Sequence, residues 1–210
     1  MSIKKLIGRL LILALLLGGA YHFWYVKLNY RFAEVSQEDN PNKVYRSGLI
    51  SPDNIDSFLE KGKIKTVINL LDASVNDKLN PAGKKHIDDE DKAIAQFNKE
   101  HNKSVQHINI PSRQIPTKKT LSEFFKVLDN KDNYPVLIHC YHGTGRAELY
   151  SALYRIEYEK MKNDDARKKT RMVVEGLGYT SSFGQGRKKG DFLINYKSRD
   201  KNDATIDRIK

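Results

Sequence analysis

Between residues 44 and 177, short apolar runs alternate with stretches whose apolar residues recur at helical spacing. The predicted strands are residues 44–47, 64–71, 105–110 and 135–139. The predicted helices are one capped by Ser51 with Pro52 at its first position, one around 88–101, one capped by Thr117, and a pair at 147–161 and 163–177. Such alternation is typical of an α/β domain with a largely parallel sheet. We predict a small central sheet of about four to five strands flanked by helices.

An uncharged apolar stretch precedes this domain. Residues 10–26 carry no charged side chain, and Lys4, Lys5 and Arg9 come before them. As a helix the stretch is about 25 Å long, and residues 6–7 extend it toward the roughly 30 Å of a bilayer core. We therefore predict one transmembrane helix with its N-terminus inside the cell, which places the domain on the outer, periplasmic side.

A cleaved signal peptide is the alternative to this anchor. Gly18 and Ala20 are small residues, spaced like those before a signal cleavage site. Either interpretation divides the chain into an anchor or signal segment at 1–26, a tether at 27–43, a domain at 44–180 and a basic tail at 181–210. In that tail we expect loose packing, with residues 192–196 docking on the domain.

Charge and cysteine content restrict the classes of site and partner. Thirty-seven Lys and Arg against twenty-six Asp and Glu give a net charge of +11, which suits nucleic acid, an anionic membrane or a phosphorylated substrate. No zinc-finger, basic-zipper or RNA-recognition motif accompanies the charge, so we expect no nucleic-acid partner. One cysteine excludes an internal disulfide and metal sites that need several thiolates. We expect neither a metal nor a cofactor.

That one cysteine, Cys140, ends an apolar run and begins a glycine-containing loop, and Arg146 opens the next helix. Unpaired backbone amides at a helix N-terminus bind anions, and their field favours the thiolate form of a nearby cysteine. Arg146 is placed to bind two phosphate oxygens at once, a geometry that lysine cannot supply. The predicted phosphate-binding residues are Tyr141, His142, Gly143, Thr144, Gly145 and Arg146.

The pattern His-Cys-x5-Arg from His139 to Arg146 resembles the signature of the cysteine-dependent tyrosine and dual-specificity phosphatases. Residues 44–49 and 66–70 are similar to the opening of the bacterial and atypical dual-specificity members, and the resemblance covers about residues 44–178. It implies that Cys140 attacks phosphorus and forms a phosphocysteine, which water then hydrolyses. It further implies that Arg146 and the loop amides hold the phosphate oxygens while His139 supports the thiolate. Without the resemblance, a buried structural cysteine beside a surface arginine is the alternative.

Two positions depart from the family pattern. Ala147 stands where the family usually has Ser or Thr, whose hydroxyl stabilises the leaving thiolate. The family's acidic proton donor is absent from residues 110–116, so we rank Asp72 first as its replacement, ahead of the cluster at 88–91 and His142. In the same loop, Arg113 is a candidate to contact a second phosphate or an anionic head group.

We therefore predict a membrane-anchored phosphomonoesterase whose substrate is a phosphoprotein, a phosphorylated lipid or an inositol phosphate. The alternative is a phosphatase-like module that binds phosphorylated ligands with little turnover, as Ala147 and the missing acid suggest.

Overall fold

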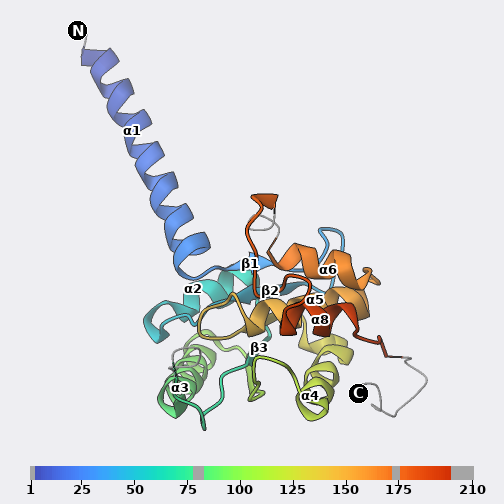
Figure 1. Ribbon diagram of the computed structural model, residues 1–210. Helices are drawn as coiled ribbons and strands as arrows, with labels where there is room; N and C mark the ends of the chain where they lie inside the picture. Colours follow the sequence, from blue (N-terminus) through green and yellow to red (C-terminus); the bar gives the residue numbers. More distant parts are fainter. Residues whose placement is uncertain (1–2, 78–82, 172–175, 200–210) are drawn as a thin grey trace.

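The computed structural model describes residues 3–77, 83–171 and 176–199 (Figure 1). A five-stranded sheet with the order β1-β2-β5-β3-β4 forms its centre. β1 runs antiparallel to β2 and the other neighbours are parallel, as the alternating sequence predicts. The strands are β1 Ala33–Glu34, β2 Val44–Ser47, β3 Thr66–Asn69, β4 Gln106–Asn109 and β5 Val136–His139.

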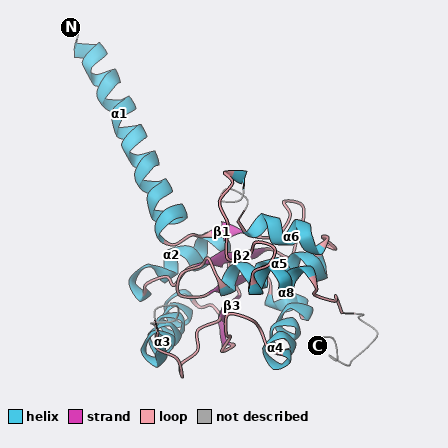
Figure 2. Ribbon diagram, viewed as in Figure 1, coloured by secondary structure: helices cyan, strands magenta, loops and turns pink. Residues whose placement is uncertain are grey.

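Helices cover both faces of the sheet (Figures 1 and 2). Alternate side chains of a strand point to opposite faces, so Val67 and Leu137 pack on one side while Ile68, Val136 and Ile138 pack on the other. The first face carries α2 Pro52–Gly62 and α3 Gly83–His101; the second carries α4 Lys118–Asp129, the 3-10 turn η2 Lys131–Asn133, α5 Arg146–Tyr158, α6 Asn163–Thr170 and α8 Lys188–Ile194.

The helix starts predicted after Thr117 and at 147 and 163 agree with the structure to within one residue, whereas α3 begins at Gly83, before the predicted 88, and the side-chain cap predicted at Ser51 is absent. At α4 the Thr117 hydroxyl accepts from the Thr120 amide at 3.2 Å, and the Thr120 hydroxyl accepts from the Thr117 amide at 3.0 Å, which forms a capping box. α2 begins at Pro52 after Ser51, whose hydroxyl accepts from the Asn54 side-chain amide at 2.8 Å instead of from a helix backbone amide.

The segment predicted as a tether is part of the packed domain. Tyr30, Phe32 and Val35 are buried, because the rings of Tyr30 and Phe32 each pack against Phe58 of α2 with centroids 5.2 Å apart. β1 then pairs with β2. The domain therefore begins upstream of Val44.

One long helix leaves this domain at its N-terminal end. α1, Ile3–Phe23, continues into a π-helical turn, η1 Trp24–Asn29, and projects away from the sheet (Figure 1). Its large apolar side chains from Leu6 to Trp24 are exposed. Residues Leu6–Val26 are long and apolar enough to cross a membrane, and a signal sequence has the same properties.

The C-terminal region differs from the sequence expectation. The helix predicted at 163–177 ends at Thr170, and the rest of that prediction falls partly on residues 172–175, which lie outside the described residues. Residues 181–199 are not a loose tail: the side chains of Phe183 and Leu193 are fully buried in the core, and α8 packs on α5 and α6. The expected docking of residues 192–196 is seen where the Tyr196 hydroxyl donates to Glu157 at 2.6 Å.

Candidate active site

Cys140 lies at the carboxyl edge of the sheet, directly after β5. β5 runs between β2 and β3, so the Cys140 loop, residues 140–145, has a strand end on either side and feeds directly into α5. Ligands of open α/β sheets bind at this edge. Only 2% of the Cys140 surface is exposed.

The Cys140 loop is shaped by a glycine that no other residue replaces without movement. Gly143 has φ +68°, and a Cβ there would stand 2.5 Å from the backbone nitrogen of Gly48. The Leu49 amide also donates to the Tyr141 carbonyl at 3.0 Å. The turn after β2 therefore packs directly under the loop, in the segment where residues 44–49 carry the family resemblance.

Arg146 is buried and held in one orientation. Its Nη1 donates to the carbonyls of Leu70, at 2.8 Å, and Ser112, at 3.2 Å. Burial lowers the pKa of Arg146, and nearby Cys140 and Asp72 oppose that shift, so the guanidinium stays charged at neutral pH. These contacts fix the guanidinium beside the Cys140 loop, where Arg146 lines the same cavity as Cys140.

Two further arginines contact the loop, and no local sequence pattern predicts either contact. Arg46 donates to the Gly143 carbonyl at 3.2 Å and forms an ion pair of 2.7 Å with the buried Glu148 of α5. Arg31 donates to the carbonyl of His142. These contacts occupy the carbonyls of His142 and Gly143 and hold the loop in place.

His139 belongs to a buried network centred on Glu90 of α3. One carboxylate oxygen of Glu90 accepts from the Asn69 amide at 2.6 Å and contacts Nε2 of His139 at 2.9 Å and Nε2 of His107 at 3.0 Å. Burial alone would raise the pKa of Glu90, but His139 and His107 outweigh it and lower the pKa to about 2. The ring that precedes Cys140 is thus fixed by an ionised carboxylate.

The acidic cluster at 88–91 does not reach the loop. Asp88 and Asp89 pair with lysines one helical turn earlier in α3, at 2.6 and 2.5 Å, and Asp91 contacts His107 at 3.1 Å. Of this cluster, Glu90 alone is buried, and it acts through His139 and His107.

Asp72, the residue ranked first as proton donor, is held as a carboxylate. The Ser74 hydroxyl, at 2.6 Å, lowers the pKa of Asp72 more than burial raises it, and the Ser74 amide and Arg113 lower it further. Nε of Arg113 lies 3.2 Å from the Asp72 carboxylate. An ionised carboxylate cannot donate a proton, and this geometry therefore disfavours the role that the sequence suggested.

A cavity of about 640 Å³ opens over the Cys140 loop. Of the predicted phosphate-binding residues, His142, Thr144, Gly145 and Arg146 line it together with Cys140, while Tyr141 and Gly143 face the turn after β2. The other lining residues are Gln114 and Ile115 and a set from the C-terminal region: Arg171, Thr180, Ser181, Ser182, Arg187, Lys188 and Lys189. No motif in the sequence of that region indicates a role in the site.

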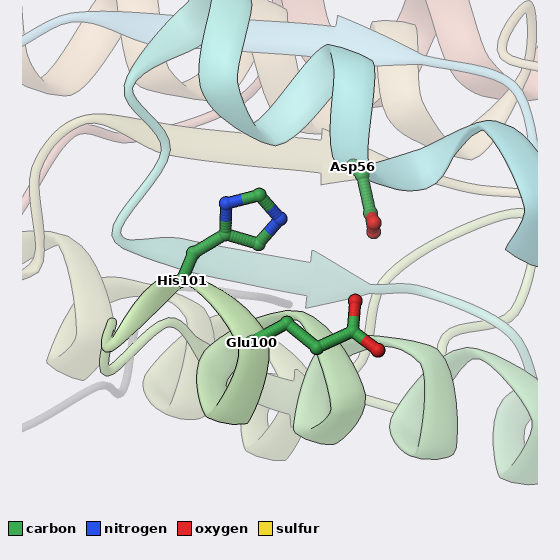
Figure 3. A group of neighbouring side chains, drawn as sticks. All are labelled: Asp56, Glu100 and His101. Carbon is green, nitrogen blue, oxygen red and sulfur yellow. The ribbon is translucent and has the colours of Figure 1, made fainter.

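One group of potential metal ligands lies elsewhere in the described part of the chain. Asp56 of α2 and Glu100 and His101 of α3 have donor atoms within 4.8 Å of one another, in the space between the two helices (Figure 3). His101 already contacts Glu60 at 3.3 Å. α3 reaches this point as it leads into the start of β4, so the group lies at the opposite edge of the sheet from Cys140.

Comparisons with known proteins agree with this architecture. The sequence profile described as the tyrosine phosphatase family matches residues 28–155. The core catalytic domain of the PP-IP phosphatase Siw14 from S. cerevisiae, solved with citrate, aligns with a TM-score of 0.51 and 17% identity, covering 77% of this chain and 82% of that one. A putative phosphatase from Shewanella putrefaciens aligns with a TM-score of 0.53 and 22% identity, covering 81% and 93%. No curated protein matches the sequence.

Proposed function

The chain belongs to the tyrosine phosphatase family, and from this premise we propose that it hydrolyses phosphomonoesters through a phosphocysteine formed on Cys140. The observation that carries the proposal is the placement of Cys140 and the buried Arg146 on one cavity, joined by a loop that leads into a helix N-terminus. Arg146 and the loop amides bind the non-bridging oxygens there.

The reaction has two steps. The Cys140 thiolate attacks phosphorus in line with the ester oxygen; an S–P bond forms, the O–P bond breaks, and the leaving oxygen takes a proton from water. Water then attacks the phosphocysteine, releases inorganic phosphate and restores the thiolate. An aryl phosphate departs without acid assistance, so this substrate tests the nucleophile independently of any proton donor.

The test is hydrolysis of para-nitrophenyl phosphate by the full chain in detergent. We expect turnover by the parent protein and none by Cys140→Ser. Lys99→Met is the control, because Lys99 lies on the surface near the end of α3, which leads into the start of β4 at the opposite edge of the sheet. Turnover that survives in Cys140→Ser refutes the phosphocysteine.

A second candidate is a module that binds phosphorylated ligands and turns them over poorly. Ala147 favours it, since its buried methyl group offers no hydroxyl to the departing thiolate. The same assay separates the two: binding of phosphate esters without aryl phosphate turnover supports the module and excludes the enzyme.

We further propose that α1 anchors the chain in a membrane with the domain on the outer, periplasmic side. The proposal is supported by the length and exposure of the apolar helix and by the three cations at 4, 5 and 9 before it. A periplasm-dependent reporter fused to the C-terminus must be active. The mass of the mature chain then distinguishes an anchor, which is retained, from a signal peptide, which is removed.

A further inference from the structure

The cavity over Cys140 holds more cations than one phosphate requires. Five of its lining residues are Arg or Lys and, within the described residues, none is Asp or Glu. Arg146 serves the reacting phosphate. The other four, Arg171, Arg187, Lys188 and Lys189, lie beyond residues 28–155, the part matched to the family.

Among these cations, Lys189 lies against the Cys140 loop. Its Nζ lies 3.2 Å from the point where a Cβ would stand on Gly145. The buried ring of Phe183 supports the ammonium group from below, with 5.3 Å between Nζ and the ring centroid. Burial lowers the pKa of Lys189, and Arg146 and Arg171 add to this while Cys140 opposes it. The side chain is thus held at the rim of the loop and repelled by its neighbours.

Arg171 lines the same cavity with unused hydrogen-bonding capacity. Its Nε is buried and has no hydrogen-bond partner among the described residues. Burial raises the pKa of Glu148, although Arg171 is close enough to lower it. The Glu148 carboxylate is already paired with Arg46 at 2.7 Å. A buried donor without a partner costs free energy, so the described residues do not fully satisfy the Arg171 guanidinium.

Arg113, the sequence candidate for a second phosphate, does not share this arrangement. It pairs with Asp72 and is not among the residues that line the cavity. For Arg171 and Lys189, by contrast, the described residues place no carboxylate within 4.0 Å. Within the described residues, neither side chain therefore has a carboxylate partner, and an anionic ligand would supply one.

We propose that Arg171 and Lys189 form a second anion subsite beside the Cys140 loop, which binds a second phosphate of the same substrate. The inference rests on the proposed function and deepens it: the substrate carries a second phosphate close to the reacting one, either on a lipid head group or on a free polyol. Arg171 suits a bidentate contact with such a phosphate, and Lys189 supplies a point charge.

The test compares an inositol monophosphate with a vicinal inositol bisphosphate as ligands of the full chain in detergent. Binding is measured by calorimetry in the Cys140→Ser background, so the result does not depend on turnover. The same two compounds are used as inhibitors of para-nitrophenyl phosphate hydrolysis by the parent protein. We expect the bisphosphate to bind more tightly in both formats.

Lys189→Met and Arg171→Met should each lower the preference for the bisphosphate about 10-fold or more, the contribution of one charge-assisted hydrogen bond. Lys189→Arg should restore most of the preference. Lys99→Met removes the same charge at the opposite edge of the sheet and should leave the preference unchanged. Equal affinity for the two ligands, or a preference that survives both Met variants, overturns the proposal.

Two further arms identify the source of the second phosphate. Mixed micelles with phosphatidylinositol bisphosphate are compared with the soluble bisphosphate at equal concentration. Stronger Lys189-dependent inhibition by the micelles assigns the subsite to lipid head groups, and stronger inhibition by the soluble compound assigns it to free polyol phosphates. The parent protein could fail to hydrolyse para-nitrophenyl phosphate while the Cys140→Ser protein still binds the bisphosphate more tightly than the monophosphate. That result refutes the proposed function and supports the subsite.

Discussion

Replacing Glu90 by Gln tests the buried network behind Cys140. The substitution keeps the shape of the side chain and removes the charge that three donors share at 2.6, 2.9 and 3.0 Å. In the folded chain the pKa of Glu90 is about 2, against an ordinary value of 4.5. A shift of that size corresponds to about 3 kcal/mol of stability, and Glu90 is too deeply buried for solvent to screen it.

The pH range of the effect follows from the direction of each shift. The folded pKa of Glu90 is depressed, so its contribution is present above pH 4.5 and is lost as pH falls toward 2. The pKa of His107 is raised by Glu90 and Asp91 against the opposing effect of burial, so its contribution is present below pH 6.5 and is lost as pH rises through the folded value. The network stabilises the fold most between these limits.

The assay is thermal unfolding of the full chain in detergent, followed by circular dichroism from pH 3 to pH 8. At pH 5.5 we expect Glu90→Gln to unfold about 6–12 °C below the parent, since about 3 kcal/mol shifts a chain of this size by that amount. At pH 3 the difference should fall to about 1 kcal/mol.

Glu100→Gln is the matched control on the same helix, because Glu100 is exposed and, among the described residues, accepts a hydrogen bond only from Gln96. It should change stability by less than about 0.5 kcal/mol. The electrostatic explanation fails if Glu90→Gln and Glu100→Gln melt together at pH 5.5, or if the Glu90→Gln deficit is as large at pH 3.

Three further substitutions address the Cys140 loop. Arg146→Lys loses the contacts to the Leu70 and Ser112 carbonyls and the bidentate fork, so kcat/KM for para-nitrophenyl phosphate should fall about 10²–10³-fold while the melting temperature shows that the protein is folded. Gly143→Ala places a Cβ 2.5 Å from the Gly48 nitrogen, and the φ of +68° costs a non-glycine residue about 1–2 kcal/mol. Both the melting temperature and the turnover of para-nitrophenyl phosphate should drop. An unchanged rate would show that catalysis does not need this loop shape. Ala147→Ser offers a hydroxyl to the leaving thiolate and should speed phosphocysteine hydrolysis about 10–100-fold, seen by rapid quench as a smaller burst of nitrophenol.

Local sequence patterns predicted the fold and the Cys140 loop because the interactions that form these elements join residues close together in the sequence. Apolar runs with flanking caps located four of the five strands, and Thr117 caps α4 as expected. The Cys140 loop was recognisable because strand, glycines and helix start are contiguous. β1 was missed, since two residues carry no periodicity and the strand exists through its pairing with β2.

The residues around the loop were missed because chain-distant segments bring them there. Arg31 lies 111 positions before His142, whose carbonyl it contacts. Lys189 was not recognised as a neighbour of the loop, because residues 181–199 contain several other basic residues. One signal was readable: Glu90 precedes Ile94 and Phe97 at helical spacing, so a carboxylate stands on the apolar face of α3. A charge in that position requires buried partners.

Shortening the chain from its N-terminus tests whether the segment predicted as a tether, residues 27–43, is part of the fold. The Gly48 amide donates to the Tyr30 carbonyl at 2.7 Å, and Arg31 contacts the Cys140 loop directly. A chain that starts at residue 21 keeps these contacts and should melt within a few degrees of the parent, with full aryl phosphate turnover. A chain that starts at residue 44 loses the buried side chains of Tyr30, Phe32 and Val35, each contributing about 2 kcal/mol, which together match much of a typical domain's stability. It should therefore be unfolded by circular dichroism, and a folded, active chain from residue 44 would show that the segment before β2 neither completes the core nor positions the loop.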